Sequence, residues 1–360
     1  MSKSSSVSAT STKVAAKKSP PKQKVSGVIL IDKPIGMTSQ QVVSKVKYLL
    51  QSMHHDSKKA GHTGTLDPMA TGLLPVCLGE ATKFSHYQLD ADKSYQATIL
   101  LGSQTDTGDA DGQIIAEKPI PLFNQAHLEK IAQQFLGAQQ QIPPMYSALK
   151  KDGKKLYEYA RAGIEIEREP RAITIKAIEL TLIDDTSINL TVTCTKGTYV
   201  RVLGEDIAKA LGTVGHLTAL RRLQVGKFHI DEAIELATLE QLALEQRMAQ
   251  LLAVDACIDI AAQMVLTAEQ CQRLRLGQRL NVIEQLNASL QDYISQTLAI
   301  EKAQTASTIA LTENITEPQS TVPDYELPVD IRLIDEQGDF IGLGAISLNG
   351  RLQPKKIISL

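Results

Sequence analysis

The chain has 360 residues, of which 43% are hydrophobic and 22% charged, and a formal net charge of −2 at pH 7. This size and apolar content suit two domains with their own cores, and no apolar run is long enough to cross a bilayer as a helix. The N-terminus lacks the apolar stretch of a secretory signal, and Cys77, Cys194, Cys257 and Cys271 include no close pair at zinc-ligand spacing. We therefore expect a cytoplasmic protein with reduced thiols and no bound metal.

Two segments have compositions that cannot bury enough apolar surface to fold. Residues 1–25 carry six lysines and no acidic residue, which predicts a disordered basic tail. Residues 281–328 carry seven acidic residues against Lys302, and they are much longer than a usual connection. We interpret them as a low-complexity acidic insertion with one helix near 282–298. The two charges cancel, so any nucleic-acid surface must be a local basic patch.

The fold is expected to begin with a short apolar strand in residues 26–34, GVILIDKP, followed by a turn at Gly36. Thr38 or Ser39 can then cap a helix. Its apolar residues recur at helical spacing and should face the core: Val42, Val43, Val46, Leu49 and Leu50.

The stretch from Lys59 to Lys83 is dense in glycine and proline, which predicts a shaped loop and no regular element. Asp67 precedes Pro68, so its backbone is biased toward an extended conformation. An Asp-Pro pair alone indicates only an ordinary turn. Two adjacent histidines upstream, His54 and His55, read as solvated surface because no further ligand follows at a suitable spacing.

The middle of the chain alternates strand and helix patterns. We expect strands at 95–101, 172–183 and 188–194, the last two antiparallel, and helices at 125–136, 196–211 and 236–252. In the helix at 125–136 the inward residues should be Leu128, Ile131, Ala132, Phe135 and Leu136.

Two charged clusters in this region allow alternative interpretations. Asp106, Asp109 and Asp111 suggest a calcium loop, but the glutamate and flanking helices of an EF-hand are missing. Lys150, Lys151, Lys154 and Lys155 are interleaved with Tyr146, Tyr157 and Tyr159. These four lysines form either a solvated face or a set of phosphate contacts.

The string GHTGTLDPMATGLLPVCLGEATK at residues 61–83 resembles the signature of the TruB family of RNA pseudouridine synthases over roughly twenty consecutive positions. Four further blocks extend the resemblance: GVILIDKP, KSY at residues 93–95, KGTYVR at 196–201 and LRRL at 220–223. The resemblance implies that Asp67 is the catalytic aspartate and Tyr95 the active-site tyrosine, which stacks on the flipped uracil and takes part in proton transfer. Arg201 would pair with Asp67, where a guanidinium fork keeps a carboxylate ionised and oriented.

The resemblance also implies substrate-binding residues. His62 would insert into the RNA loop and stack there, as an aromatic ring can. Leu220 is expected beside the active site, with Arg221 or Arg222 facing RNA. Lys33, from GVILIDKP, and Tyr199, from KGTYVR, complete the expected set. The resemblance also makes residues 105–112, TDTGDADG, a surface loop of the family. Family context favours phosphate contact by Lys150, Lys151, Lys154 and Lys155.

The fold class implied is α+β: a pseudouridine synthase catalytic domain at 26–252 with a mixed, mainly antiparallel sheet, plus a small C-terminal PUA-like β domain at 253–360. Residues 265–280 contain Arg273, Arg275 and Arg279, and residues 329–360 alternate as three strands. This second domain would bind RNA, and the insertion at 281–328 would interrupt it.

The function implied is isomerisation of uridine 55 in the tRNA T loop to pseudouridine, by base flipping and without a cofactor. The expected partner is the tRNA T stem-loop, with no membrane and no obligate protein partner, so a monomer is expected. Asp67 could attack the base, attack the sugar or deprotonate the sugar. Two alternatives are an RNA-binding or RNA-folding protein, which would not need Asp67, and a glycoside hydrolase, which usually needs two carboxylates.

Overall fold

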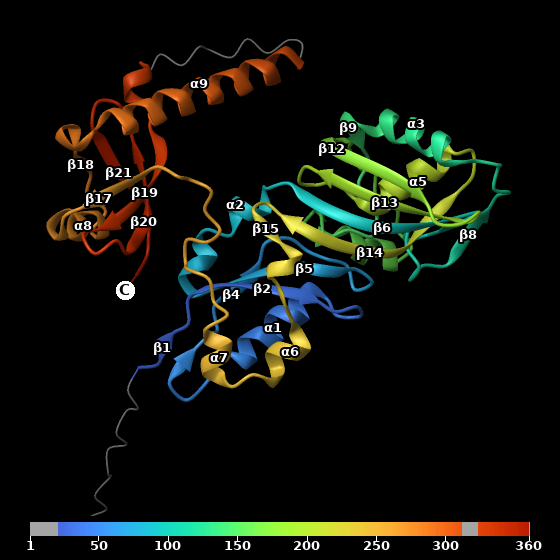
Figure 1. Cartoon of the computed structure of the whole chain (residues 1–360), viewed down its shortest axis with the longest axis horizontal. Coiled ribbons are helices and arrows are strands. Elements are labelled where there is room, and N and C mark those ends of the chain that lie inside the picture. The colour runs from blue at the N-terminus through green and yellow to red at the C-terminus, as the bar shows by residue number, and fades with distance from the viewer. Residues whose placement is uncertain (1–20, 312–322, 360) are drawn as a thin grey trace, which may run out of the picture.

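The structure, a computed structural model, describes residues 21–311 and 323–359 (Figure 1). Most of the predicted tail and residues 312–322 of the predicted insertion lie outside these ranges. Across the described part of the chain, no helix is both long and apolar enough to cross a membrane.

A ten-stranded sheet forms the larger part of the molecule. In spatial order its main path is β16 (Ile234–Glu235), β2 (Gly27–Lys33), β5 (Thr71–Leu78), β14 (Gly215–Val225), β6 (Lys93–Leu101), β13 (Ser187–Cys194), β12 (Arg171–Leu182) and β9 (Gly137–Gln141), with β15 (Phe228–His229) on β14 and β4 (Ala60–His62) on β5. The pairs β16–β2 and β5–β14 are parallel and the others are antiparallel. The predicted mixed, mainly antiparallel sheet is thus confirmed.

Helices cover this sheet in two separate groups. Helices α3 (Gln125–Phe135) and α5 (Val200–Ala210) pack on β6, β12, β13 and β14, where their aliphatic side chains form one core. Helices α1 (Ser39–Leu49) and α6 (Leu236–Gln241) pack on β2 and β5 around a second core. The Thr38 side chain caps α1 as one alternative predicted, and all five predicted core residues of that helix are buried.

The remaining elements of this part are short. They are β1 (Gln23–Lys24), β3 (His55–Asp56), β7 (Ser103–Thr105), β8 (Ile114–Glu117), β10 (Lys150–Lys151), β11 (Lys154–Lys155), α2 (His86–Leu89), α4 (Leu156–Arg161), α7 (Leu244–Met248) and the 3-10 helices η1 (Gly79–Lys83) and η2 (Ile230–Glu232).

A five-stranded sheet forms the C-terminal β domain, which lies beside one end of the larger sheet (Figure 1). Its order is β17 (Gln263–Leu266), β19 (Val329–Asp335), β20 (Phe340–Ile346), β21 (Arg351–Ile357) and β18 (Leu280–Asn281), accompanied by α8 (Ala268–Arg275), α9 (Ala288–Leu311), η3 (Ile283–Gln285) and η4 (Asp324–Glu326). A shared cluster that includes Val28, Phe84, Cys257 and Leu343 joins the two parts.

The prediction that Lys59–Lys83 is one loop is wrong. Only residues 63–70 form a loop, because β4 and β5 occupy the flanks. Gly72 is needed inside β5 because a Cβ there would lie 2.3 Å from the Arg222 carbonyl oxygen of the adjacent strand. Pro75 lies between the part of β5 that pairs with β14 and the part that pairs with β4, so its missing N–H breaks neither ladder.

Both low-complexity segments contribute more to the fold than predicted, although the helix expected near 282–298 overlaps α9. Residues 23–24 form β1, and Val25 is buried against the α1 core because its side chain is apolar. Helix α9 packs Leu290, Ile294 and Leu298 into the C-terminal core, and the figure shows it running along that domain (Figure 1). Their spacing of four residues places them on one helix face, so the acidic residues of this segment did not prevent burial.

Three helix boundaries differ from prediction. The segment 236–252 contains two helices, because Leu242 and Ala243 are extended and the Gln246 side chain caps the second. Helix α5 begins at Val200, since Gly197 adopts a positive φ of 84°. Leu136 is extended beyond the end of α3 and is exposed, whereas Leu128, Ile131 and Ala132 are buried as expected.

Candidate active site

Asp67 lies in the loop 63–70, which connects β4 to β5. The Ser39 hydroxyl donates to the Leu66 carbonyl oxygen at 3.0 Å and accepts from the Leu66 amide at 2.8 Å. The Gly36 amide donates to the Pro68 carbonyl oxygen at 2.8 Å. These bonds fix the loop on both sides of Asp67, whose side chain remains 38% exposed.

Arg201 joins Asp67 to a second carboxylate. Its Nη2 lies 3.1 Å from Asp67 Oδ2 and its Nη1 lies 3.4 Å from Asp109 Oδ2. The guanidinium also donates to the carbonyl oxygens of Thr107 at 2.6 Å and Tyr146 at 2.7 Å. Arg201 is only 5% exposed, so its position on the first turn of α5 is fixed from several directions.

Asp109 is a site residue that the sequence interpretation missed. It was expected in a surface loop, but it is buried and accepts a hydrogen bond from the Thr107 hydroxyl at 2.6 Å. The cluster of three aspartates between glycines was the available signal. Neither a calcium loop nor a surface loop of the family predicts that Asp109 lies next to Arg201, because the two residues are far apart in sequence.

The pKa of Asp67 is raised from its ordinary value. Partial removal from water is the largest cause, and the Asp109 carboxylate adds to it, whereas Arg201 and Lys33 act in the opposite direction. The expectation that Arg201 favours the ionised carboxylate therefore holds in direction, but burial outweighs it. A carboxylate whose pKa is raised is a better proton acceptor near neutral pH than an exposed aspartate.

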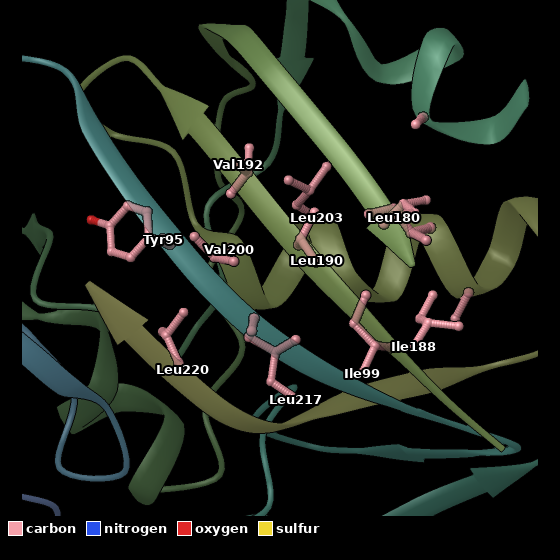
Figure 2. Close-up of a cluster of buried hydrophobic side chains, with 14 of the residues drawn as sticks. Tyr95, Ile99, Leu180, Ile188, Leu190, Val192, Val200, Leu203, Leu217 and Leu220 are labelled. Carbon is pink, nitrogen blue, oxygen red and sulfur yellow. The ribbon is translucent and has the colours of Figure 1, made fainter. Parts of the chain in front are cut away.

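Tyr95 lies on β6 at one end of the α5 core, beside Val200 and Leu220 (Figure 2). Its hydroxyl points away from the aliphatic side chains of this cluster (Figure 2). Burial raises the pKa of Tyr95, and Asp67 is close enough to raise it further. Tyr95, Leu220, Asp67 and Arg201 therefore meet at one place, although they come from β6, β14, the loop and α5.

The neighbouring arginines Arg221 and Arg222 point to opposite faces of β14. Arg221 is half-exposed and forms a bidentate ion pair with Asp32, at 3.0 and 2.6 Å. Arg222 is fully buried and donates to backbone carbonyls. Arg222 therefore cannot face RNA in this structure, because successive strand residues alternate between faces.

Lys33 is fully buried, which contradicts a direct contact with substrate. Its ammonium donates to the carbonyl oxygens of Pro34, Met37 and Pro68, and burial lowers its pKa to about 8. It thus supports the loop directly after Asp67.

His62 and Tyr199 are both half-buried at the edge of the site. His62 ends β4, and its Nδ1 accepts a hydrogen bond from the Gly64 amide at 3.3 Å. Burial and the charge of Arg222 lower the pKa of His62, which favours the neutral ring suited to stacking. The backbone of Tyr199 is held by the Gln141 amide at the start of α5.

Two pairs of lysines occupy β10 and β11, which form a hairpin across a turn with positive φ at Asp152 and Gly153. They are Lys150, Lys151, Lys154 and Lys155, hereafter the hairpin lysines. Three of the four are exposed and Lys155 is half-buried. The ammonium of Lys154 lies 5.0 Å from the centre of the Tyr159 ring, and that of Lys155 lies 5.3 Å from the centre of the Tyr157 ring. The hairpin follows the segment whose Tyr146 carbonyl holds Arg201, so it projects from the margin of the site.

A cavity of about 360 Å³ lies behind Leu220, on the face of the sheet opposite Tyr95. Its lining combines apolar and uncharged polar side chains with one arginine: Ile35, Met69, Thr71, Gln96, Ala97, Thr98, Asn189, Thr218, Ala219, Leu220 and Arg221. Neither Asp67 nor Arg201 lines this cavity.

Comparison with protein families assigns most of the chain. Residues 52–200 match the family described as "TruB family pseudouridylate synthase (N terminal domain)". Residues 201–265 match "tRNA pseudouridylate synthase B C-terminal domain", and residues 323–358 match "Pseudouridine synthase II TruB, C-terminal".

Curated relatives agree with this assignment. The chain is 70% identical to "tRNA pseudouridine synthase B" of Psychrobacter cryohalolentis, over 99% of this chain and all of the relative. It is 65% identical to the protein of the same name from Psychrobacter arcticus, with the same coverage of both chains. Identity to that of Ralstonia pickettii is 49%, over 72% of this chain and 81% of the relative.

Two solved structures share the fold at low identity. "Structure of H/ACA RNP bound to a substrate RNA containing 2'-deoxyuridine" aligns with a TM-score of 0.59 and 19% identity, over 93% of this chain and 85% of the other. "Crystal structure of the archaeal box H/ACA sRNP Nop10-Cbf5 complex" aligns with a TM-score of 0.56 and 20% identity, over 92% and 86%.

Proposed function

Because the chain belongs to the TruB family of tRNA pseudouridine synthases, we propose that it isomerises uridine 55 in the T loop of tRNA to pseudouridine. In this reaction the bond from N1 of uracil to C1′ breaks and a bond from C5 to C1′ forms. C5 loses a proton and N1 gains one, so the atoms balance. The reaction consumes no second substrate. The target nucleotide must leave the stacked loop before either bond is accessible.

The observation that carries this proposal is the pairing of Asp67 with the buried Arg201 at 3.1 Å. Asp67 is exposed enough to reach a nucleotide, whereas Arg201 is held from behind by backbone carbonyls. We assign to Asp67 the first step of glycosidic cleavage, to Arg201 the orientation of the carboxylate, and to Tyr95 stacking on the flipped uracil.

A glycoside hydrolase remains a poorer match even though Asp109 is a second carboxylate. The two carboxyls of a glycosidase flank the bond that breaks. Asp109 is buried and pairs with a different nitrogen of Arg201 from the one that faces Asp67, so the guanidinium separates the two carboxylates.

RNA binding is assigned to groups around this pair. We propose that His62 stacks in the RNA loop, that Tyr199 and Leu220 contact the target nucleotide, and that the hairpin lysines and Arg221 contact phosphates. We further propose that residues 26–252 form the catalytic domain. Residues 253–360 would form an RNA-binding domain, in which the exposed Arg273, Arg275 and Arg279 supply positive charge. We also expect a monomer that acts on tRNA in the cytoplasm.

The test is the substitution Asp67→Asn, which keeps the shape of the side chain and removes its charge. The purified variant should form no pseudouridine in an unmodified tRNA transcript, while its affinity for that transcript stays near that of the wild type. A transcript with cytidine at position 55 serves as the control for the site of modification. Substantial product from Asp67→Asn, or wild-type product at another uridine, would refute the proposal.

A further inference from the structure

Arg222 is a buried cation with an incomplete set of partners. It lies on β14 and has no exposed surface. Its Nε donates to the Leu73 carbonyl oxygen at 2.8 Å and its Nη2 to the Gly64 carbonyl oxygen at 3.1 Å. Among the described residues, its Nη1 has no hydrogen-bond partner and no carboxylate pairs with the guanidinium. A buried charge without a counterion is costly, so a function for it should be sought.

The two carbonyl groups that Arg222 binds lie near the two ends of the loop 63–70. Leu73 lies near the start of β5, which follows the loop, and Gly64 lies between His62 and Asp67. The unpartnered Nη1 lies against Gly64, where a Cβ would be 3.4 Å away. The guanidinium therefore ties both ends of the loop to β14 through two hydrogen bonds from a charged donor.

The third side of the guanidinium faces Tyr95. Arg222 and Tyr95 are directly opposite in the antiparallel pair β14–β6, so their side chains lie on the same face. The Tyr95 hydroxyl interacts with the guanidinium and opposes the effect of burial on the pKa of Arg222. Lys33, His62 and Lys93 also lie within electrostatic reach of Arg222, and Cys194 and Asp67 within reach of Tyr95.

We propose that Arg222 is a positioning residue of the active site, which fixes the loop before Asp67 and holds the Tyr95 hydroxyl with Nη1. Its catalytic effect rests on the proposed function and acts through Tyr95, since Arg222 is too deeply buried to contact RNA. Catalytic hydrogen bonds are often long or poorly aligned before substrate binds. This accounts for the lack of a hydrogen bond between Nη1 and the Tyr95 hydroxyl in this structure.

A double-mutant cycle in thermal stability tests the contact without any assay of activity. The four proteins are wild type, Tyr95→Phe, Arg222→Gln and the double variant. Tyr95→Phe should lower the melting temperature although Phe is more apolar, because it leaves a buried charged donor without its acceptor. The same substitution should have little effect once Arg222 is Gln. Equal effects of Tyr95→Phe in both backgrounds would overturn the proposal.

If Arg222→Gln does not fold, two other comparisons decide the question. An unchanged or higher melting temperature of Tyr95→Phe in the wild-type background would by itself overturn the contact. Arg222→Lys keeps the charge but cannot reach three acceptors, so it should retain part of the stability coupling to Tyr95.

The positioning role is tested by single-turnover kinetics with excess enzyme on the tRNA transcript. Arg222→Gln should lower the rate constant about tenfold to a hundredfold, the effect expected when a hydrogen bond to a charged group is removed, with tRNA affinity little changed. Arg222→Lys should recover part of this activity.

Arg247→Gln is the matched control, because Arg247 also binds only backbone carbonyls but does so between α1 and α6, away from the site. It should lower the melting temperature and leave the rate constant unchanged. A rate constant for Arg222→Gln like that of Arg247→Gln would reduce Arg222 to a structural role. If the wild type itself failed to modify uridine 55, the proposed function would fall while the stability cycle would still report on the contact.

Discussion

The substitution Arg201→Gln should move the acidic limit of activity to higher pH. If Asp67 begins glycosidic cleavage as proposed, only its ionised form is active, so activity should fall as pH drops through the pKa of that group. Burial and Asp109 already raise this pKa, and Arg201 is the largest factor that lowers it. Removal of the positive charge therefore raises the pKa further.

The size of the shift follows from the geometry of the pair. Two unit charges about 4 Å apart at an effective dielectric constant of about 20 interact by about 4 kcal/mol. Arg201 Nη2 and Asp67 Oδ2 are 3.1 Å apart, but 38% of the Asp67 side chain is exposed, so solvent screening reduces the interaction. We expect about 1.4 kcal/mol to remain, which corresponds to about one pH unit.

The assay is the single-turnover rate of pseudouridine formation across the acidic and neutral pH range at saturating enzyme. Arg201→Lys, which retains a positive charge, should shift the acidic limb less than Arg201→Gln. Asp109→Asn should shift it in the opposite direction, to lower pH, because the Asp109 carboxylate raises the pKa of Asp67. An identical acidic limb in wild type and Arg201→Gln would refute the reasoning. So would shifts of the same sign in Arg201→Gln and Asp109→Asn.

Two further predictions concern RNA binding and the C-terminal domain. Changing all four hairpin lysines to Gln should flatten the slope of log affinity for tRNA against log salt concentration. The slope should fall by about one unit for each lysine that binds a phosphate in the wild type, with uridine 55 still modified at saturation. An unchanged slope would place these lysines on a solvated face. In α9, Ile294→Ala should lower the free energy of unfolding by about 2–5 kcal/mol in denaturant titrations. Ile300→Ala, at a position 58% exposed, should change it by less than about 0.5 kcal/mol, and equal effects would show that α9 does not pack as described.

Local sequence patterns correctly predicted those elements that depend on residues close together in the chain. The Thr38 cap and the apolar stripe of α1 are both present, as are the antiparallel strands β12 and β13. The family motifs indicated Asp67 and Arg201, and the structure brings the two together. In each case the relevant residues are close in sequence or belong to a specific motif.

The glycines and prolines of β5 led to the wrong prediction of a loop. These residues usually indicate a local turn, whereas in β5 their positions are explained by contacts with neighbouring strands. Gly72 permits the close approach of β14, and Pro75 lies where the strand has no ladder partner on one side. Helix α9 was missed as a core element for a related reason. Leu or Ile at every fourth position forms an apolar face on α9, and the acidic composition of the whole segment obscured this pattern.

The assignment of Arg221 and Arg222 depends on strand register, which no local pattern determines. Adjacent residues of a strand face opposite sides, so one arginine of the pair had to point inward. The pairing of Arg222 with Tyr95 and with Gly72 decides which one. The same pairing places a positive charge beneath the active-site loop, where the sequence indicated only an RNA-facing arginine.

The burial of cations also explains how a chain of net charge −2 can carry local positive charge around the loop 63–70. Lys33, Lys93 and Arg222 are buried, and each donates to backbone carbonyl oxygens. None of the three forms an ion pair with a carboxylate in the described part of the chain. Carbonyl dipoles satisfy their hydrogen bonds without cancelling their charge, and low-dielectric surroundings extend the reach of that charge. We therefore propose that this charge attracts an anionic polymer toward the loop that carries Asp67.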